Sequence, residues 1–128
     1  PEAEWRLADH ATLQWWIAPN ALLSHTRDIV LLWSFSSPSP DRCDVTTSLY
    51  SAQAPRSDAD AARLAEAFAL QLRVTGAEDF PMGERIQRSL DSGALPELVL
   101  GRNEVGVIHF HRTLAALLAA APGAEGRA

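Results

Sequence analysis

Hydrophobic and polar residues alternate with a period of two through much of the first half of the chain. In residues 13–17, the apolar residues Leu13, Trp15 and Ile17 alternate with Gln14 and Trp16. Because successive side chains of a β-strand point to opposite faces, this alternation predicts a strand. Pro19 and Asn20 are typical of a turn, and residues 21–28 form a second short strand that ends in polar turn residues.

The clearest alternation lies in residues 29–35. Four large apolar residues share one face of this segment: Ile29, Leu31, Trp33 and Phe35. Residues 36–42 contain two prolines, which cannot donate to a strand ladder, so we expect a loop there. Alternation resumes in residues 43–52. The short connections between these segments predict an antiparallel meander of about four strands.

The second half of the chain has the periodicity of α-helices. Ser57 and Asp60 have the spacing of a capping box, and Gly76 stands where a C-terminal cap belongs, which predicts a helix between them. A second helix is predicted from about Phe80 to Leu90, and Asn103 is predicted to cap a third. Two of these helices carry apolar stripes: Leu64, Phe68 and Leu72 in the first, and Val107, Phe110, Leu114, Leu117 and Leu118 in the last.

Together these segments predict an α+β fold, with one antiparallel sheet of about four strands and three helices packed on one of its faces. A chain of 128 residues is expected to form a single domain. Tryptophans on both faces of the sheet make it apolar on both sides in places, and three helices cover only one side. We therefore expect further chain, a partner or a second copy on the other side. The first residue is Pro1 rather than Met, which also suggests a piece of a longer chain.

Composition excludes several functions. The formal net charge is −5 and the basic residues form no run, which argues against nucleic acid as a partner. A lone cysteine, Cys43, rules out an internal disulfide and any multi-cysteine zinc or iron–sulfur site, and it fits a reducing, cytoplasmic location. No apolar run has the length of a membrane span, so we expect no membrane association.

The acidic pair Glu78 and Asp79 is the chain's most informative polar feature. A helical projection places Asp79 on the same face as Ile86 and Leu90, whereas Glu84 falls on the opposite, solvated face. A carboxylate that points inward must be paired, hydrogen-bonded or bound to a metal. Two interpretations follow: Asp79 is the N-cap of the second helix, or it is an inward-facing functional carboxylate.

The order of motifs resembles a known family. Residues 78–112, "EDFPMGERIQRSLDSGALPELVLGRNEVGVIHFHR", resemble the C-terminal end of the catalytic α subunit of Rieske-type non-haem iron aromatic-ring-hydroxylating oxygenases. Residues 15–50 are similar to the sheet of that family, and the resemblance extends over roughly residues 8–120. It implies that the chain is part of a helix-grip (START-like) catalytic domain, with no Rieske domain present.

The resemblance also implies a site. In the family, two histidines and one carboxylate hold Fe(II) and leave positions open for O₂, and the carboxylate maps to Asp79. The implied substrate is an apolar or aromatic small molecule, hydroxylated or demethylated in aromatic compound catabolism, with a ferredoxin or reductase as the electron donor and a homo-oligomeric enzyme. Phe80, Met82, Trp15 and Trp33 are the implied substrate-binding residues.

The chain departs from the family pattern in its histidines and cysteines. The family's H-x4-H pair is absent: His10 and His25 are far apart, and His109 and His111 are two residues apart on a predicted helix. One cysteine cannot hold a Rieske [2Fe–2S] cluster, which belongs to the missing part. The chain by itself therefore cannot run the oxygenase reaction. A non-catalytic helix-grip module that binds an apolar ligand or serves assembly is the alternative.

Overall fold

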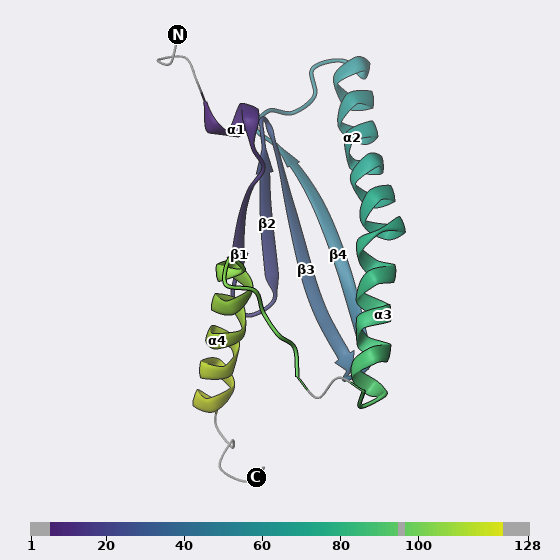
Figure 1. The fold of residues 1–128 in the computed structure, drawn as a ribbon. Helices are drawn as coiled ribbons and strands as arrows, with labels where there is room; N and C mark the ends of the chain where they lie inside the picture. The colour runs from purple at the N-terminus through teal and green to yellow at the C-terminus, as the bar shows by residue number, and fades with distance from the viewer. Residues whose placement is uncertain (1–5, 95–96, 122–128) are drawn as a thin grey trace.

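The computed structural model describes residues 6–94 and 97–121 of the chain; Pro1 lies outside them. Four strands form one antiparallel sheet in the order β1-β2-β3-β4 (Figure 1): β1 (Leu13–Ile17), β2 (Ala21–Thr26), β3 (Ile29–Ser39) and β4 (Arg42–Ser51). A short helix, α1 (Leu7–His10), precedes the sheet, and three follow it: α2 (Asp58–Ala77), α3 (Asp79–Asp91) and α4 (Val105–Ala120). The predicted α+β fold class is confirmed, and it is consistent with part of a helix-grip catalytic domain.

The strand register sorts the side chains onto two faces. One cross-strand row joins Trp16, Leu22, Trp33 and Thr47. We call the face with this row the inner face, because it holds the two most buried strand residues, Trp33 at 6% and Ser24 at 7% exposure. On the outer face Trp15 and Tyr50 keep about half of their surface, at 48% and 54%. The helices thus leave the outer face uncovered, as the tryptophan pattern predicts.

Helix α2 turns one side toward the sheet. Thr75 is its most buried residue, at 7% exposure, and Leu64, Phe68 and Gln71 on the same side are half-buried. The predicted stripe is therefore right at Leu64 and Phe68 but wrong at Leu72, which is 42% exposed. Near the start of α2, the Arg63 guanidinium lies 2.9 Å from a carboxylate oxygen of Asp28 in the β2–β3 turn, which ties the helix to the sheet.

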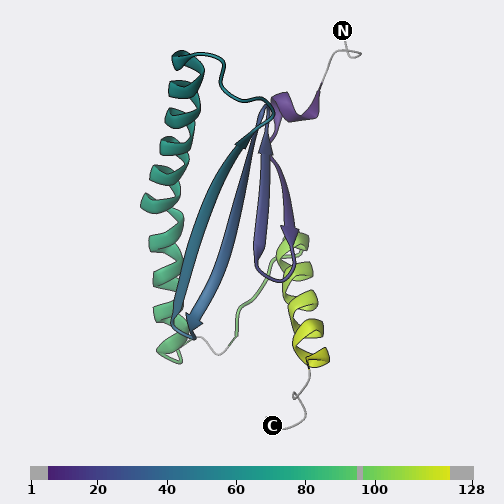
Figure 2. The same ribbon diagram turned by 180° about the vertical axis from the view of Figure 1, so that it is seen from behind.

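Helices α2 and α3 run end to end as one bent helix (Figure 2). The predicted cap at Gly76 is wrong, because the N–H of Glu78 still donates to the carbonyl of Val74 at 2.9 Å. Pro81 follows in the first turn of α3. Proline has no N–H, and its ring crowds the carbonyl four residues earlier, that of Ala77. The helix therefore does not end at the glycine. It is interrupted at Glu78, in the turn before Pro81, and its direction changes there.

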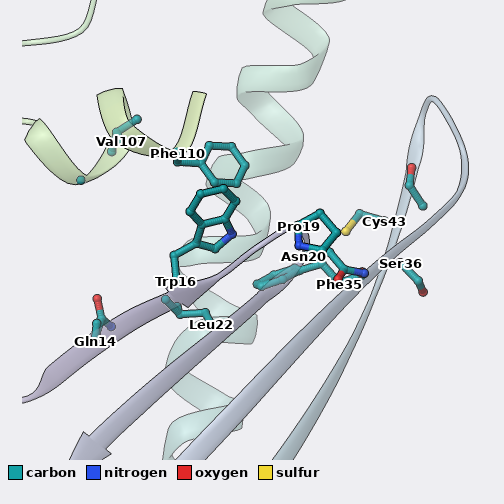
Figure 3. A pocket seen from close by; sticks show the side chains of 12 residues that line it. Gln14, Trp16, Pro19, Asn20, Leu22, Phe35, Ser36, Cys43, Val107 and Phe110 are labelled. Atoms are coloured by element: carbon teal, nitrogen blue, oxygen red, sulfur yellow. The ribbon is translucent and has the colours of Figure 1, made fainter. Parts of the chain in front are cut away.

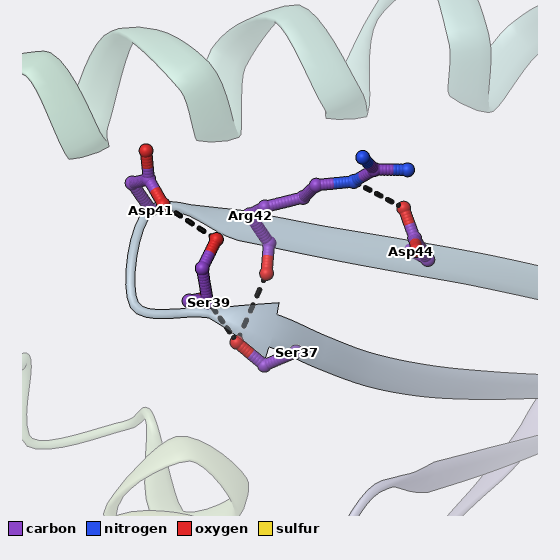
Figure 4. A network of polar contacts seen from close by, with 5 residues as sticks. All are labelled: Ser37, Ser39, Asp41, Arg42 and Asp44. Carbon is purple, nitrogen blue, oxygen red and sulfur yellow. Dashed lines mark hydrogen bonds and ion pairs between the residues drawn. The ribbon is translucent and has the colours of Figure 1, made fainter.

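The predicted loop over residues 36–42 is also wrong. Strand β3 continues to Ser39 and β4 begins at Arg42, so that only two residues make the turn. The ladder is irregular between Ser36 and Ser39, and Pro38 lies inside this irregular stretch. A proline at a bulge removes no regular ladder bond, so the strand tolerates it. Figure 4 shows the turn, where the Ser39 hydroxyl donates to Asp41 at 2.6 Å.

Helix α4 starts one residue later than predicted. Glu104 rather than Asn103 is its N-cap residue, and the Glu104 carboxylate accepts a hydrogen bond from the N–H of Gly101. Along the predicted stripe, Phe110 and Leu114 are half-buried, whereas Leu118 is 62% exposed. No helix in the described part of the chain is long and apolar enough to cross a membrane.

Replacement of Trp33 tests the importance of the inner face. Trp33→Ala is expected to lower the free energy of unfolding by about 3–5 kcal/mol, because it removes a buried indole and leaves a cavity. Trp15→Ala, on the outer face, is the matched control and should cost about half as much or less. Urea denaturation followed by circular dichroism measures both. An equal loss in the two variants would contradict the assignment of inner and outer faces.

The start of α2 predicts a pH dependence. The Ser57 hydroxyl and, next, the backbone N–H of Arg56 hold the pKa of Asp60 below its ordinary value. A lowered pKa in the folded state means that this stabilisation is complete above about pH 4 and is lost as the pH falls further. Asp60→Asn should therefore be less stable than the parent at pH 7, with a difference that shrinks below pH about 4. Denaturation at a series of pH values checks this, and a difference independent of pH would refute it.

Candidate functional site

A large hollow of the described chain lies on the inner face, at the end of the sheet where α4 meets β1 (Figure 3). Its volume is about 1020 Å³. Three strands and α4 contribute most of its wall, together with the β1–β2 turn and the first residues of β4. The lining residues are Gln14, Trp16, Pro19, Asn20, Leu22, Phe35, Ser36, Ser37, Cys43, Gly106, Val107 and Phe110.

An aromatic pair connects the sheet and α4 at this cavity. The rings of Trp16 and Phe110 have centroids 4.6 Å apart and planes at 65°, an edge-to-face arrangement. The His109 ring lies near the same indole, with centroids 6.3 Å apart. Trp16 can reach α4 because the strand's alternation directs it to the inner face, opposite to Trp15. The pair therefore both anchors α4 and forms one wall of the cavity.

Three polar side chains of the lining already make hydrogen bonds within the protein. The Asn20 amide donates to the carbonyl of Phe35 at 2.7 Å. The Ser37 hydroxyl lies within hydrogen-bond distance of two carbonyl oxygens, those of Ser39 at 2.8 Å and Arg42 at 2.9 Å. The Gln14 amide donates more weakly to Ser24, at 3.4 Å. These groups stiffen the cavity's rim and leave its interior mainly apolar.

The structure does not bring the four predicted substrate-binding residues together. Trp33 lies on the inner face beside Leu22 but does not line the cavity, and Trp15 lies on the outer face. Phe80 and Met82 are on α3, 41% and 51% exposed, and neither lines the cavity. Their roles stay predictions.

The predicted substrate-binding residues leave out three aromatic residues of the wall: Trp16, Phe35 and Phe110. The signal for Trp16 was present, because it alternates with Trp15 on a strand that is apolar on both faces. Phe110 belonged to the predicted stripe of α4, but the pattern along a helix does not say which strand it meets.

The carboxylate of Asp79 is exposed, so the prediction of a buried carboxylate is wrong for the described chain. The alternative that Asp79 caps α3 is also wrong: Glu78 holds the N-cap position and its side chain makes no cap hydrogen bond. Asp79 instead occupies the first turn of α3, where a negative charge interacts favourably with the helix dipole. It lies four residues beyond the buried Thr75, just past the interruption of the helix at Glu78.

The described residues do not form a complete iron site. No group of three or more His, Cys, Asp or Glu side chains within residues 6–94 and 97–121 could hold a metal ion. His25 instead lies 2.9 Å from the carbonyl of Arg27, and His111 makes a ring contact with Phe110 at 5.2 Å between centroids. A centre of two histidines and one carboxylate therefore does not fit these residues alone.

A comparison with protein families gives one match. The family model of the ring-hydroxylating α subunit, catalytic domain, matches residues 1–120 of the 128-residue chain. Comparisons with curated proteins and with solved structures gave no match. The matched range includes the sheet, the bent helix and α4, and it confirms the resemblance seen in the sequence.

The aromatic pair predicts a measurable coupling between β1 and α4. A double-mutant cycle of Trp16→Ala and Phe110→Ala should give a coupling energy of about 0.5–1.5 kcal/mol, the usual range for an edge-to-face pair. The cycle of Trp15→Ala with Phe110→Ala is the control and should give a value near zero, because Trp15 lies on the outer face. Equal coupling in both cycles would mean that Trp16 does not hold α4.

Proposed function

Since the chain belongs to the family of ring-hydroxylating α subunit catalytic domains, we propose that it forms part of the substrate- and iron-binding region of such an oxygenase. The bound iron of such an enzyme activates O₂ for hydroxylation or demethylation of an aromatic substrate, with electrons from a ferredoxin or reductase. The observation that carries the proposal is the apolar cavity between the inner face and α4, within the range that the family model matches.

In this proposal the cavity forms one wall of the substrate pocket. Binding sites for small molecules are mostly apolar, with a few polar groups that fix orientation, and the cavity has this character. Trp16 and Phe110 provide aromatic surface, and Asn20 and Ser37 lie at the rim. The apolar side chains of this wall remove water from the side of an aromatic substrate that lies against them, and such removal of apolar surface from water is the main source of binding energy for such a molecule.

We further propose that Asp79 is the carboxylate ligand of the iron. Within the described residues its side chain forms no hydrogen bond or ion pair, so both of its oxygens are available. Asp79 lies in the first turn of α3, between the break at Glu78 and Pro81, so its position is set where the helix changes direction. The two histidine ligands and the Rieske cluster then come from polypeptide outside the described residues.

The absence of a three-residue metal cluster among the described residues favours a second candidate. In this alternative the chain is a non-catalytic helix-grip module whose cavity binds an apolar ligand or serves assembly. The two candidates share the cavity and differ at Asp79. Only the oxygenase proposal gives that carboxylate a function.

Metal binding separates the two candidates when the chain is titrated together with the polypeptide that supplies the two histidines. Anaerobic titration with Fe(II), followed by calorimetry, should show binding that Asp79→Ala weakens by about tenfold or more, because a direct ligand is lost. Glu78→Ala is the matched control: it removes the neighbouring carboxylate and the same charge, and it should change the affinity less than about twofold.

Equal affinity in Asp79→Ala and the parent would reject Asp79 as a ligand and support the binding module. Because Asp79 is exposed, Asp79→Ala should leave the free energy of unfolding nearly unchanged, within about 0.5 kcal/mol. A loss of binding together with a loss of stability would therefore point to misfolding rather than to a lost ligand.

A further inference from the structure

None of the described residues that line the cavity has a charged side chain, although the chain has eleven basic and sixteen acidic residues. From this we propose that the cavity selects uncharged aromatic ligands of two or more rings and rejects aromatic carboxylates of the same shape. The inference rests on the proposed function in one respect, namely that this cavity holds the substrate. It adds the charge class of that substrate.

Desolvation is the first reason. An ionised carboxylate that enters an apolar cavity loses its water and must regain the lost interactions from a cation or from several hydrogen-bond donors. Two of the donors at the rim already serve the protein: the Asn20 amide binds the carbonyl of Phe35, and the Ser37 hydroxyl binds main-chain carbonyls. Cys43 offers only a thiol, which is a weak donor. The cavity thus has little with which to stabilise an anion.

The arginine next to the lining in sequence does not supply the missing charge. Arg42 precedes Cys43 on β4, and neighbouring residues of a strand point to opposite faces. Its guanidinium pairs with the Asp44 carboxylate at 2.9 Å (Figure 4). Both residues alternate with Cys43 along the strand, so the pair lies on the opposite face. Arg42 is therefore both directed away from the cavity and already neutralised.

Size and aromatic surface are the second reason. A volume of about 1020 Å³ lies at the upper end of the range of roughly 300–1,000 Å³ that is usual for small-molecule pockets. A single ring would leave much of this space unfilled. Trp16 and Phe110 are already in edge-to-face contact at 4.6 Å, and Phe35 adds a third ring to the wall (Figure 3). A fused-ring ligand can stack against or meet the edges of several of these rings at once.

A pair of probes that differ only in charge tests the selectivity. Methyl naphthyl ketone and naphthoate have nearly the same shape, and at pH 7 only naphthoate is ionised. Binding to the full chain, without metal, is measured by calorimetry. The ketone should bind at least about tenfold more tightly than naphthoate. Equal binding, or tighter binding of naphthoate, would overturn the proposal.

Variants locate the binding. Trp16→Ala should weaken binding of the ketone by about tenfold, whereas Trp15→Ala, on the adjacent residue of the outer face, should leave it unchanged. Trp16→Phe keeps an aromatic ring and should retain most of the binding, which separates a lost contact from a lost fold. An equal effect of Trp16→Ala and Trp15→Ala would show that the ligand binds elsewhere and would overturn the proposal.

A variant that adds a positive charge to the cavity provides a third test of the proposal. Cys43 is exposed at the rim, so Cys43→Arg places a cation at the cavity without the free-energy cost of burying a charge. This variant should raise the affinity for naphthoate by about tenfold and lower the preference for the ketone. No change would contradict the role assigned to missing charge.

The outcomes also separate this inference from the proposed function. Preferential binding of naphthoate would overturn the charge class but keep the cavity as a ligand site. If neither probe binds, the cavity fails as a ligand site, and the inference fails with it. The Fe(II) titration of Asp79→Ala is independent of both results, because no cavity residue takes part in it.

Discussion

The contact between Trp16 and Phe110 is the interaction on which the cavity depends. Helix α4 comes late in the chain and has no buried residue of its own, so it needs a side chain on the sheet to hold it. Trp16 supplies this contact, and the rings meet at 4.6 Å. Because an edge-to-face pair is bulky, it joins α4 to the sheet and at the same time keeps the helix backbone away from it. The space that results is the cavity.

The strand pattern predicted most of the sheet because its cause is local. Alternation reflects the geometry of a single strand, and it identified Trp33 and its neighbours on one face before any pairing was known. It failed at residues 36–42, where composition favoured a loop. Whether a proline is tolerated depends on the partner strand: Pro38 falls where the ladder is already irregular. The prediction of a helix end at Gly76 failed for a similar reason. A glycine ends a helix only if the residues after it leave the helical conformation, and here the helical hydrogen bonds continue as far as Glu78.

The site was harder to predict because a period of two separates the faces of a strand without saying which face is covered. Trp15 and Trp16 are equally apolar in the sequence, yet only Trp16 meets a helix. The contact with Phe110 determines which of the two tryptophans meets a helix. Phe110 lies far along the chain, and local patterns contain no information on such a contact. Asp79 shows the same limit. Its projection onto a helix placed it on the face of Ile86 and Leu90, but burial depends on what lies opposite, and in the described residues Asp79 is exposed.

The bend at Pro81 connects these two parts of the site. A straight helix that continued from Thr75 through Ile86 would carry one apolar stripe along the sheet. The proline changes the direction at the first turn of α3, and the stripe beyond it, at Met82 and Ile86, is about half exposed. Asp79 lies at this transition, between a segment packed against the sheet and a segment that leaves it. A carboxylate there keeps its charge without the cost of burial. This position suits a residue that must meet a group supplied from outside the described chain, which is the role proposed for it.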